Sequence, residues 1–477
     1  MEKYIVVIGL EMHCEIKSNS KVFSSAKNSY SEMPNKNIMP LDMAFPGTLP
    51  VVNKKSVEDA IKMALILNCK IPEYLYFDRK NYYYPDLPKG YQITQCTEPI
   101  GTNGFIEIES DNKLLKVDIH DIHLEEDSAS LDHYETTSCI DYNRSGVPLL
   151  ELVTEPCLHS ASDAVAFLEH MKMVYRYTGI SEADTKKGQI RCDVNVSIME
   201  PSAKELGTRV EVKNVNGFGN VFDAINYEIK RQTELMEAGK SNKIEQETRR
   251  FDEETGTTIR MRSKVDAIDY KYFIDPNIPK YNITKDWIEK IKSTIPVLAD
   301  TRKNNYIKNY NLSEYDAVIL IKEKEIADYF EKCINLKIEA KIAANWIIGQ
   351  IMGYLNKNNL SINDIYLTPS RLSTLINLIN NGTISNKQAK DIFYKVLEEK
   401  KEIETFIDKE NKQNSNEDEL LTIIKDIINK NTNQVSEYKS GKTNLFDFFV
   451  GQVMKETKGK ANPVLTKEIL SKELNNK

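Results

Sequence analysis

Residues 8–16, Ile8-Gly9-Leu10-Glu11-Met12-His13-Cys14-Glu15-Ile16, decide the fold of the first half of the chain, because apolar and polar side chains alternate along them. This alternation is typical of a strand, since successive side chains point to opposite faces of a sheet. Glu11, His13 and Glu15 therefore share one face. For a single strand, a solvated outer face would explain this pattern well.

Two more predicted strands repeat the pattern further along the chain. The polar members of one face are Arg191, Asp193, Asn195 and Ser197 in residues 191–197, and Arg209, Glu211 and Lys213 in residues 209–213. Carboxylates and an imidazole could hold a metal ion, and Lys or Arg could neutralise phosphoryl oxygens. The repetition favours a metal–nucleotide site, with a solvated face as the alternative.

Short β-branched and aromatic runs continue to about residue 280, separated by turn signals. This texture predicts an α+β fold with a mostly antiparallel sheet. Helices are expected at residues 56–67 and 162–177, the first with Ser56 as its N-cap and Asp59 at the capping-box position. We expect turns at residues 101–104 and 216–217.

After Pro296 the sequence pattern becomes typical of helices. Ile326, Tyr329, Phe330 and Cys333 follow the i, i+3, i+4, i+7 spacing of an amphipathic helix. Residues 408–418 contain no apolar side chain and are expected to be a linker. The expected domains are thus a catalytic domain at 1–292, a helical domain at 296–407 and a small helical tail domain at 408–477.

Composition bounds the class of protein. Hydrophobic residues make up 40% and charged residues 28% of the 477 residues, which is typical of a soluble globular protein. The chain runs from Met1 directly into a predicted strand and has no apolar run of the ~18 residues that a membrane span needs. Its seven cysteines include no C-x-x-C pair, which excludes a zinc ribbon and argues against a disulfide framework. We therefore expect a cytoplasmic protein.

Familiar catalytic loops are absent from the sequence. Gly441-Lys442-Thr443 resembles the end of a phosphate-binding loop, but Ser436 stands where the first glycine belongs. No Gly-x-Ser-x-Gly elbow or Gly/Ser-rich amidase run is found. The sequence therefore shows no recognised hydrolase or amidase nucleophile.

Several motifs resemble those of a known family. They are Val7-Ile8-Gly9-Leu10-Glu11-Met12-His13, Asp78-Arg79-Lys80-Asn81-Tyr82-Tyr83-Tyr84-Pro85-Asp86, Gln189-Ile190-Arg191-Cys192-Asp193-Val194-Asn195, Gln246-Glu247-Thr248-Arg249-Arg250-Phe251, Val450-Gly451-Gln452-Val453-Met454-Lys455 and Lys458-Gly459-Lys460-Ala461-Asn462-Pro463. In this order they resemble the B subunits of the glutamyl/aspartyl-tRNA amidotransferases. The chain has no room for the domain inserted in the related archaeal protein, so the resemblance is to the bacterial type.

The resemblance implies an ATP-dependent ligase. The side-chain carboxylate of Glu or Asp, misacylated onto tRNA(Gln) or tRNA(Asn), would be phosphorylated by ATP, and ammonia would then displace the phosphate. Implied partners are an amidase (the A subunit) and a small protein (the C subunit) in a heterotrimer, together with the misacylated tRNA. The catalytic domain would resemble glutamine synthetase.

The resemblance also implies a metal site. Its Mg²⁺ ligands would be His13, Glu126 and Glu151, with Glu11 and Asp193 near a second cation. A histidine ligand by itself would sooner suggest Mn²⁺ or Zn²⁺. Glu125 replaces Glu126 if the strand register differs by one residue. His120, His123 and His133 are expected to be surface or supporting residues.

Other residues are expected to act on the substrates. Lys80, Tyr82 and Lys213 are predicted catalytic residues along with Glu11 and Asp193. A buried aromatic cluster with a lysine extended along it is the alternative for Lys80 and residues 82–84, and it is the interpretation favoured for Tyr83. Contacts to ATP or tRNA phosphates are expected from Arg191, Asn195, Arg249, Arg250 and Arg260, and tRNA contacts of the tail from Lys455, Lys458 and Lys460. Ordinary surface ion pairs are the alternative for the arginines.

A non-catalytic tRNA-binding scaffold is the competing function, because the tail resembles a module that also occurs alone. A scaffold would not need the carboxylates and the imidazole of the sheet face. The sequence leaves open which misacylated tRNA is the natural substrate.

Overall fold

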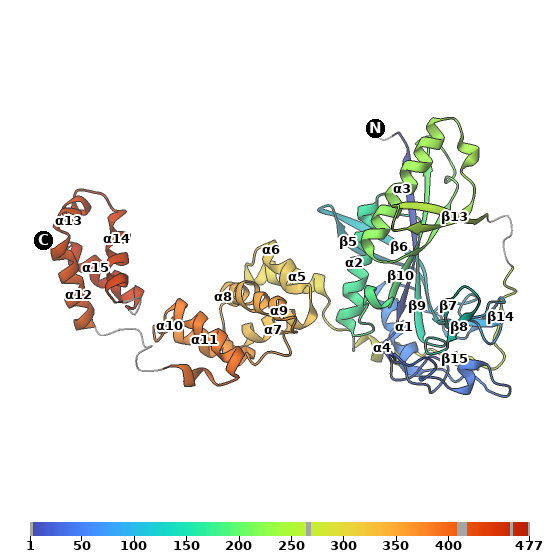
Figure 1. Ribbon diagram of the computed structural model, residues 1–477, viewed down its shortest axis with the longest axis horizontal. Coiled ribbons are helices and arrows are strands. Elements are labelled where there is room, and N and C mark those ends of the chain that lie inside the picture. The colour runs from blue at the N-terminus through green and yellow to red at the C-terminus, as the bar shows by residue number, and fades with distance from the viewer. Residues whose placement is uncertain (1–2, 264–268, 408–416, 458–460, 476–477) are drawn as a thin grey trace. The chain divides into compact units, whose positions relative to one another are not determined.

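The computed structural model describes residues 3–263, 269–407, 417–457 and 461–475. The chain divides into two compact units, Met1–Leu298 and Ala299–Lys477 (Figure 1). The first is built on strands and the second on helices, so the predicted α+β class and the helical C-terminal region are confirmed. Among the described residues, no helix combines the length and the apolar character needed to cross a membrane.

An eight-stranded sheet organises the first unit, in the order β13-β12-β11-β10-β1-β9-β6-β5. Its strands are β1 (Ile5–Glu15), β5 (Gly101–Ser110), β6 (Lys113–Glu126), β9 (Pro148–Thr154), β10 (Ile190–Met199), β11 (Val210–Val215), β12 (Glu247–Asp252) and β13 (Thr257–Ser263). Neighbouring strands are antiparallel except β11 and β12, which pair in parallel. The sheet is therefore mixed.

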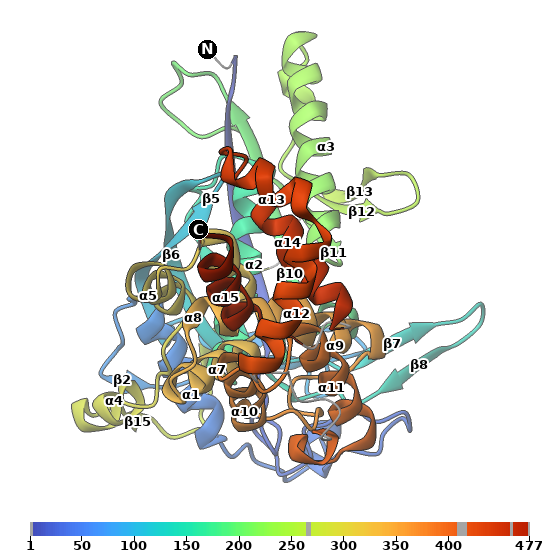
Figure 2. The ribbon, with the colours of Figure 1, turned by 90° about the vertical axis from the view of Figure 1, so that its left-hand side faces the viewer.

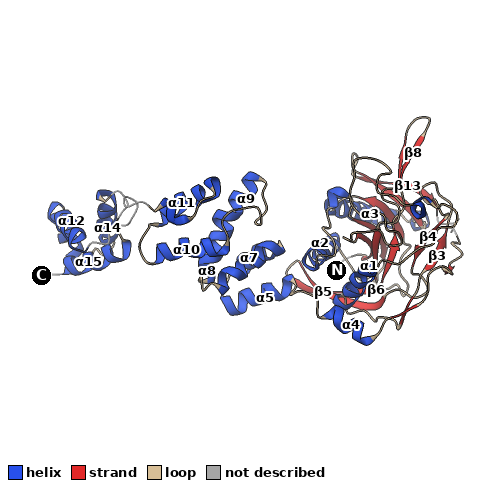
Figure 3. Cartoon of the chain, turned by 90° about the horizontal axis from the view of Figure 1, so that it is seen from below, coloured by secondary structure: helices blue, strands red, loops and turns tan. Residues whose placement is uncertain are grey.

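Helices cover one side of this curved sheet, and β3 and β4 lie on the other (Figure 3). The helices are α1 (Lys54–Ile66), α2 (Ala161–Thr178), α3 (Phe218–Glu237) and α4 (Lys285–Lys292), with short helical turns η1 (Pro40–Met43), η2 (Thr185–Lys187) and η3 (Ser241–Lys243). Leu10 and Met12 of β1 are fully buried in the core with Phe167 of α2. The apolar members of the alternating strands thus face the helices, which leaves their polar members on the other face, here called the polar face.

Smaller sheets complete the first unit. They are β14-β3-β4, with β3 (Asp78–Asn81), β4 (Tyr91–Thr94) and β14 (Phe273–Ile274), the pair β2 (Tyr74–Leu75) and β15 (Tyr281–Asn282), and the hairpin β7 (Ser130–His133) and β8 (Ser138–Asp141). Figure 2 shows the hairpin extending away from the unit. Strand β4 contacts β6, so the three-stranded sheet lies beside the large one.

The second unit is helical throughout its described residues. Its elements are α5 (Ala299–Tyr310), α6 (Glu314–Ile321), α7 (Lys324–Asn335), α8 (Ala340–Trp346), the π-helical turn η5 (Ile347–Ile351), α9 (Met352–Asn358), α10 (Pro369–Asn380), α11 (Asn386–Glu399), η6 (Ile403–Phe406), α12 (Glu417–Lys430), α13 (Thr432–Lys439), α14 (Leu445–Glu456) and α15 (Pro463–Asn475). The predicted stripe of Ile326, Tyr329, Phe330 and Cys333 is buried on α7. Residues 408–416 of the predicted linker lie outside the described residues.

Two local expectations were wrong. Helix α1 is capped by Asn53, whose side chain accepts hydrogen bonds from the backbone N–H groups of Lys55 and Ser56, so Ser56 is not the cap. The stretch 101–104 is not a turn but part of β5. Its glycines serve packing, because a Cβ at Gly104 would lie 2.4 Å from Cys69 Sγ.

Candidate active site

Three neighbouring strands place a row of polar side chains on the polar face. His13 of β1 pairs with Glu151 of β9, and Glu151 pairs on its other side with His123 of β6. Side chains of directly opposed residues lie on the same face of a sheet. The strand register thus brings these groups together from segments that are far apart in the sequence.

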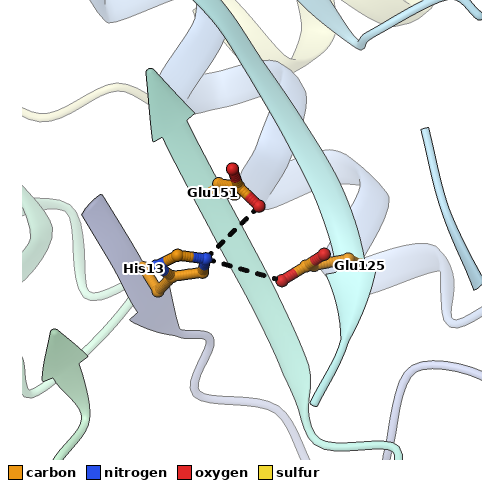
Figure 4. A group of neighbouring side chains, drawn as sticks. All are labelled: His13, Glu125 and Glu151. Carbon is orange, nitrogen blue, oxygen red and sulfur yellow. Dashed lines mark ion pairs between the residues drawn. The ribbon is translucent and has the colours of Figure 1, made fainter. Parts of the chain in front are cut away.

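His13, Glu125 and Glu151 point toward one another (Figure 4). His13 Nε2 lies 3.3 Å from Glu151 Oε2 and 3.9 Å from Glu125 Oε1. The ligand atoms of the group all lie within 4.8 Å of one another. Neighbouring and opposite ligands of one octahedral Mg²⁺ are roughly 3.0 and 4.2 Å apart, given metal–oxygen distances of about 2.1 Å. The distances of 3.3 and 3.9 Å from His13 Nε2 to the two carboxylates lie in this range and fit a cation held by the three side chains.

Glu125, and not the expected Glu126, belongs to this group. Glu126 accepts hydrogen bonds from Lys89 Nζ at 2.7 Å and from the backbone N–H of Ile93 at 2.9 Å. Adjacent residues of a strand face opposite sides, so only one of two consecutive glutamates can face His13. The pairing register of β6 shifts between Ile119 and Asp121. Counting alternate residues from the earlier part of the strand therefore does not tell which of the two glutamates faces His13.

Burial and charge give the two carboxyls of the group different proton affinities. Burial, together with the charge of Glu151, raises the pKa of Glu125 to about 7. Burial also acts to raise the pKa of Glu151, but the charges and hydrogen bonds of His123 and His13 outweigh it and hold that pKa well below its ordinary value. The carboxyl of Glu125 therefore binds a proton more readily than that of Glu151.

His123 supports the group, which is one of the two roles expected for it. Its Nε2 lies 3.3 Å from Glu151 Oε2, and its Nδ1 lies 2.7 Å from Asp121 Oδ1. The imidazole is therefore fixed between two carboxylates. The i, i+2 spacing of His123 and Glu125 is the sequence signal that could have placed both on the polar face.

A second group of carboxylates lies on β1, β10 and β11. Glu11, Asp193 and Glu211 have oxygen atoms within 4.8 Å of one another. Lys213 Nζ lies 2.7 Å from Asp193 Oδ2 and 3.2 Å from Glu211 Oε1, and Asn195 donates a hydrogen bond to Glu11 Oε1 at 3.0 Å. Oxygen ligands alone suit a hard cation. Glu211 shares its face with Lys213, but the sequence alone did not single it out.

A cavity of about 280 Å³ joins these groups. Its lining includes His13, Glu125 and Glu151 from the first group, Asp193 from the second, and the cations and tyrosine Lys80, Arg191, Lys213 and Tyr82. Arg191 donates a hydrogen bond to Asp127 Oδ2 at 2.8 Å. Most of the predicted catalytic residues therefore face one space.

A larger cavity, of about 560 Å³, adjoins the first and shares Arg191 and Asn216 with it. Glu15 lines this second cavity, and burial, together with the charge of Asp127, raises the pKa of Glu15 to about 7. The polar face thus continues past Arg191 into further solvent-accessible space.

Other predicted contacts lie elsewhere. Arg249 pairs with Glu228 and Glu247, and Arg260 pairs with Glu245 and Glu247, so both are held in ion pairs around β12 and β13. Arg250 is exposed on β12. In the tail, Lys455 is exposed on α14, and Lys458 and Lys460 lie outside the described residues.

Comparison with known proteins finds relatives along the whole chain. Residues 6–289 match the GatB/GatE catalytic domain, and residues 328–474 match a second family described as the GatB domain. Proteins named as the B subunit of aspartyl/glutamyl-tRNA(Asn/Gln) amidotransferase are similar to it: that of Persephonella marina is 44% identical over 97% of this chain and 98% of its own length. Those of Caldicellulosiruptor saccharolyticus and Brevibacillus brevis are 46% and 43% identical, covering 99% and 100% of both chains.

Proposed function

Because the chain belongs to the family of B subunits of the aspartyl/glutamyl-tRNA(Asn/Gln) amidotransferases, we propose that its polar face activates a carboxylate carried by a misacylated tRNA. The observation that carries this proposal is the convergence of His13, Glu125 and Glu151 on the cavity that Lys80 and Lys213 also line. Carboxylate activation is a ligase reaction, and the chain would carry it out as one subunit of a larger complex.

The chemistry has two steps. An oxygen of the Glu or Asp side chain attacks the γ-phosphorus of ATP, ADP leaves, and an acyl phosphate forms. Ammonia then attacks the acyl carbon, the new C–N bond replaces the C–O bond, phosphate leaves, and one proton is given up. The first step is needed because oxide is a poor leaving group and phosphate is a good one.

We assign the chain's residues to this chemistry by their charge. His13, Glu125 and Glu151 would hold one Mg²⁺, and Glu11, Asp193 and Glu211 a second. Bound Mg²⁺ neutralises charge on the phosphoryl oxygens during transfer. Lys80, Lys213 and Arg191 line the same cavity and would attract the anionic groups of ATP and substrate. Asn195, through its hydrogen bond, orients Glu11.

The division of the chain follows from the same proposal. We assign catalysis to residues 1–292, where the curved sheet with its polar face supports a relation to glutamine synthetase, and tRNA binding to the helical residues 296–407 and 408–477. Exposed Arg250 could contact a phosphate, whereas the ion pairs of Arg249 and Arg260 favour a structural role. The amidase would supply ammonia within a heterotrimer completed by the small C subunit, in the cytoplasm where tRNA is charged.

The experiment is to co-purify this chain with its amidase and small partners and assay Glu-tRNA(Gln) and Asp-tRNA(Asn) separately with ATP and glutamine. We expect ADP release that depends on the misacylated tRNA, and amide formation on at least one of them. The chain without its partners should not hydrolyse glutamine. If the chain were only a scaffold, Glu151→Gln would leave ADP release by the complex unchanged. That result would overturn the proposal.

A further inference from the structure

Tyrosines gather beside the active-site cavity. Tyr82, Tyr83 and Tyr84 follow β3, and Tyr270 and Tyr272 precede β14; we call this group the tyrosine rim. Tyr82 lines the cavity. Tyr83 is 94% exposed, Tyr84 50% and Tyr272 41%, so the expected alternative of a buried cluster is wrong for Tyr83. Large aromatic side chains exposed together next to an active site require an explanation.

Hydrogen bonds from the backbone and the side chain of Asn81 hold the two segments together. The backbone N–H of Asn81 donates to Tyr270 O at 3.0 Å, and Asn81 Nδ2 donates to Lys271 O at 2.7 Å. The ring centroids of Tyr82 and Tyr270 are 5.7 Å apart in an edge-to-face arrangement. Tyr270 and Tyr272 repeat this arrangement at 5.9 Å. The rim is therefore a connected structure.

The same loop is anchored to the cavity wall. The backbone N–H of Ala129 donates to Asp86 O at 3.0 Å, two residues beyond the cavity-lining Asp127. Tyr82, at the start of the loop, and Asp127 both line the cavity. The exposed rings of Tyr83 and Tyr84 thus belong to a segment fixed to the cavity at both ends.

A cation accompanies the rings. Lys80 Nζ lies 5.1 Å from the ring centroid of Tyr270 and 5.8 Å from that of Tyr82. The rings of Tyr82 and Tyr270 that lie near Lys80 are half-buried, and the exposed rings of Tyr83 and Tyr84 follow Tyr82 directly in the chain. Exposed rings next to a cation suit single-stranded nucleic acid, because bases stack on the rings and the cation attracts the phosphate backbone.

We propose that the tyrosine rim stacks the unpaired nucleotides at the 3′ end of the aminoacylated tRNA, with Tyr83 and Tyr84 as the principal stacking residues. The inference rests on the proposed function, in which the reacting carboxylate lies in the cavity. That carboxylate is attached through its amino acid to the 3′-terminal ribose. The last nucleotides must therefore pass the cavity rim, and stacking there would hold the reactive end in place.

The test uses the complete complex, with Tyr83→Ala and Tyr84→Ala combined. Binding is measured for an uncharged tRNA with its 3′ end intact and for the same tRNA trimmed of its unpaired 3′ nucleotides. Wild type should lose affinity on trimming. The double variant should bind intact tRNA roughly 10-fold or more weakly than wild type, because each stacked base contributes substantially, yet bind trimmed tRNA equally well.

Two variants sharpen the result. Replacing both tyrosines by Trp should restore binding of intact tRNA, because stacking needs a ring and not a hydroxyl. Tyr315→Ala, on α6, removes another highly exposed tyrosine, 73% exposed, and should not change the effect of trimming.

The inference is overturned if the double variant binds intact tRNA with wild-type affinity. It is also overturned if the affinities for intact and trimmed tRNA fall by the same factor. It is also overturned if the variant loses its amidase partner in sedimentation while an assembled fraction binds tRNA normally, since the rim would then be a protein interface. ADP release by the wild-type complex tests the proposed function separately, so either can fail while the other stands.

Discussion

Two adjacent glutamates at the end of β6 provide the sharpest residue-scale prediction. Glu125 faces His13, so Glu125→Gln should weaken Mg²⁺ or Mn²⁺ binding by about 100-fold or more, beyond the 10–100-fold typical of residues that only support a ligand. The loss is measured by calorimetric titration of the metal into the complex. Unfolding in urea should change little, because a buried carboxyl with a pKa near 7 is readily replaced by a neutral amide.

Glu126→Gln is the matched control. Its carboxylate pairs with Lys89, whose side chain is largely buried, so its neutralisation leaves an uncompensated cation. We expect a loss of about 3 kcal/mol in the free energy of unfolding, with metal affinity within a few-fold of wild type. The opposite pattern, with metal binding lost in Glu126→Gln and kept in Glu125→Gln, would reverse the assignment.

A second residue-scale prediction concerns pH and the helical unit. Hydrogen bonds from Arg371 and Tyr366 lower the pKa of Glu402 from 4.5 to about 2. A carboxyl with a lowered folded-state pKa stabilises the fold above its unfolded pKa, and this stabilisation disappears as pH falls through the folded value. The Tm difference between wild type and Glu402→Gln should therefore be constant from pH 8 to about 5 and shrink below about 4.5.

Thermal unfolding of the full chain at a series of pH values checks this. Glu398→Gln, at an exposed position of α11, controls for the general loss of one carboxylate. A Tm difference for Glu402→Gln that grows as the solution is acidified would contradict the prediction.

Packing between elements is tested at Gly104. Strand β5 approaches the end of α1 so closely that a Cβ at Gly104 would lie 2.4 Å from Leu67 O and from Cys69 Sγ. Gly104→Ala should destabilise the fold by about 1–3 kcal/mol through overpacking, measured by urea unfolding. Gly219→Ala on α3 is the control: nothing lies within 4 Å, and alanine there should be neutral or stabilising by up to ~1 kcal/mol. Equal effects of the two substitutions would contradict close packing as the reason for Gly104.

At the scale of elements, the sequence predicts what depends on local periodicity. The alternation along β1 placed Glu11 and His13 on one face, and the spacing of Ile326 to Cys333 located α7, because burial imposes these periods directly. The stretch 101–104 was misjudged because glycine serves both turns and close packing, and only the tertiary contact with α1 distinguishes them. Glu125 could not be chosen over Glu126, since strand pairing and the irregularity near Ile119 set the face.

At the scale of the whole molecule, the site depends on contacts that no local pattern reports. His13, His123 and Glu151 meet because β9 lies between β1 and β6, although β1 and β9 are separated by more than a hundred residues along the chain. The resemblance to a family supplied His13 and Glu151, which the periodicity of single strands could not have paired. The alternation of residues 209–213 placed Glu211 on a polar face, but its grouping with Glu11 and Asp193 depends on the position of β11 beside β10.

The last prediction concerns the tail. Helices α12–α15 have their own apolar cluster, which includes Leu420, Phe449 and Leu470, and among the residues that the structure describes its members all lie within 420–474. Because this core is complete within the tail, deleting residues 408–477 should leave the sheet unit folded and ATP binding intact. If the tail binds tRNA, the KM for misacylated tRNA should rise about 10-fold or more while kcat changes little.

Salt dependence identifies the kind of contact that is lost. Each phosphate contact contributes roughly 0.7–0.9 to the slope of log affinity against log salt concentration, so the truncated complex should show a shallower slope. Lys455→Gln, which removes one exposed cation from α14 without disturbing the cluster, should reduce the slope by about one contact at most. Lysines attract phosphates without reading bases, so the variant should weaken cognate and non-cognate tRNA alike. If truncation leaves both the affinity and the salt slope at their wild-type values, the tail is structural, and the tRNA must be held by the sheet unit or by residues 296–407.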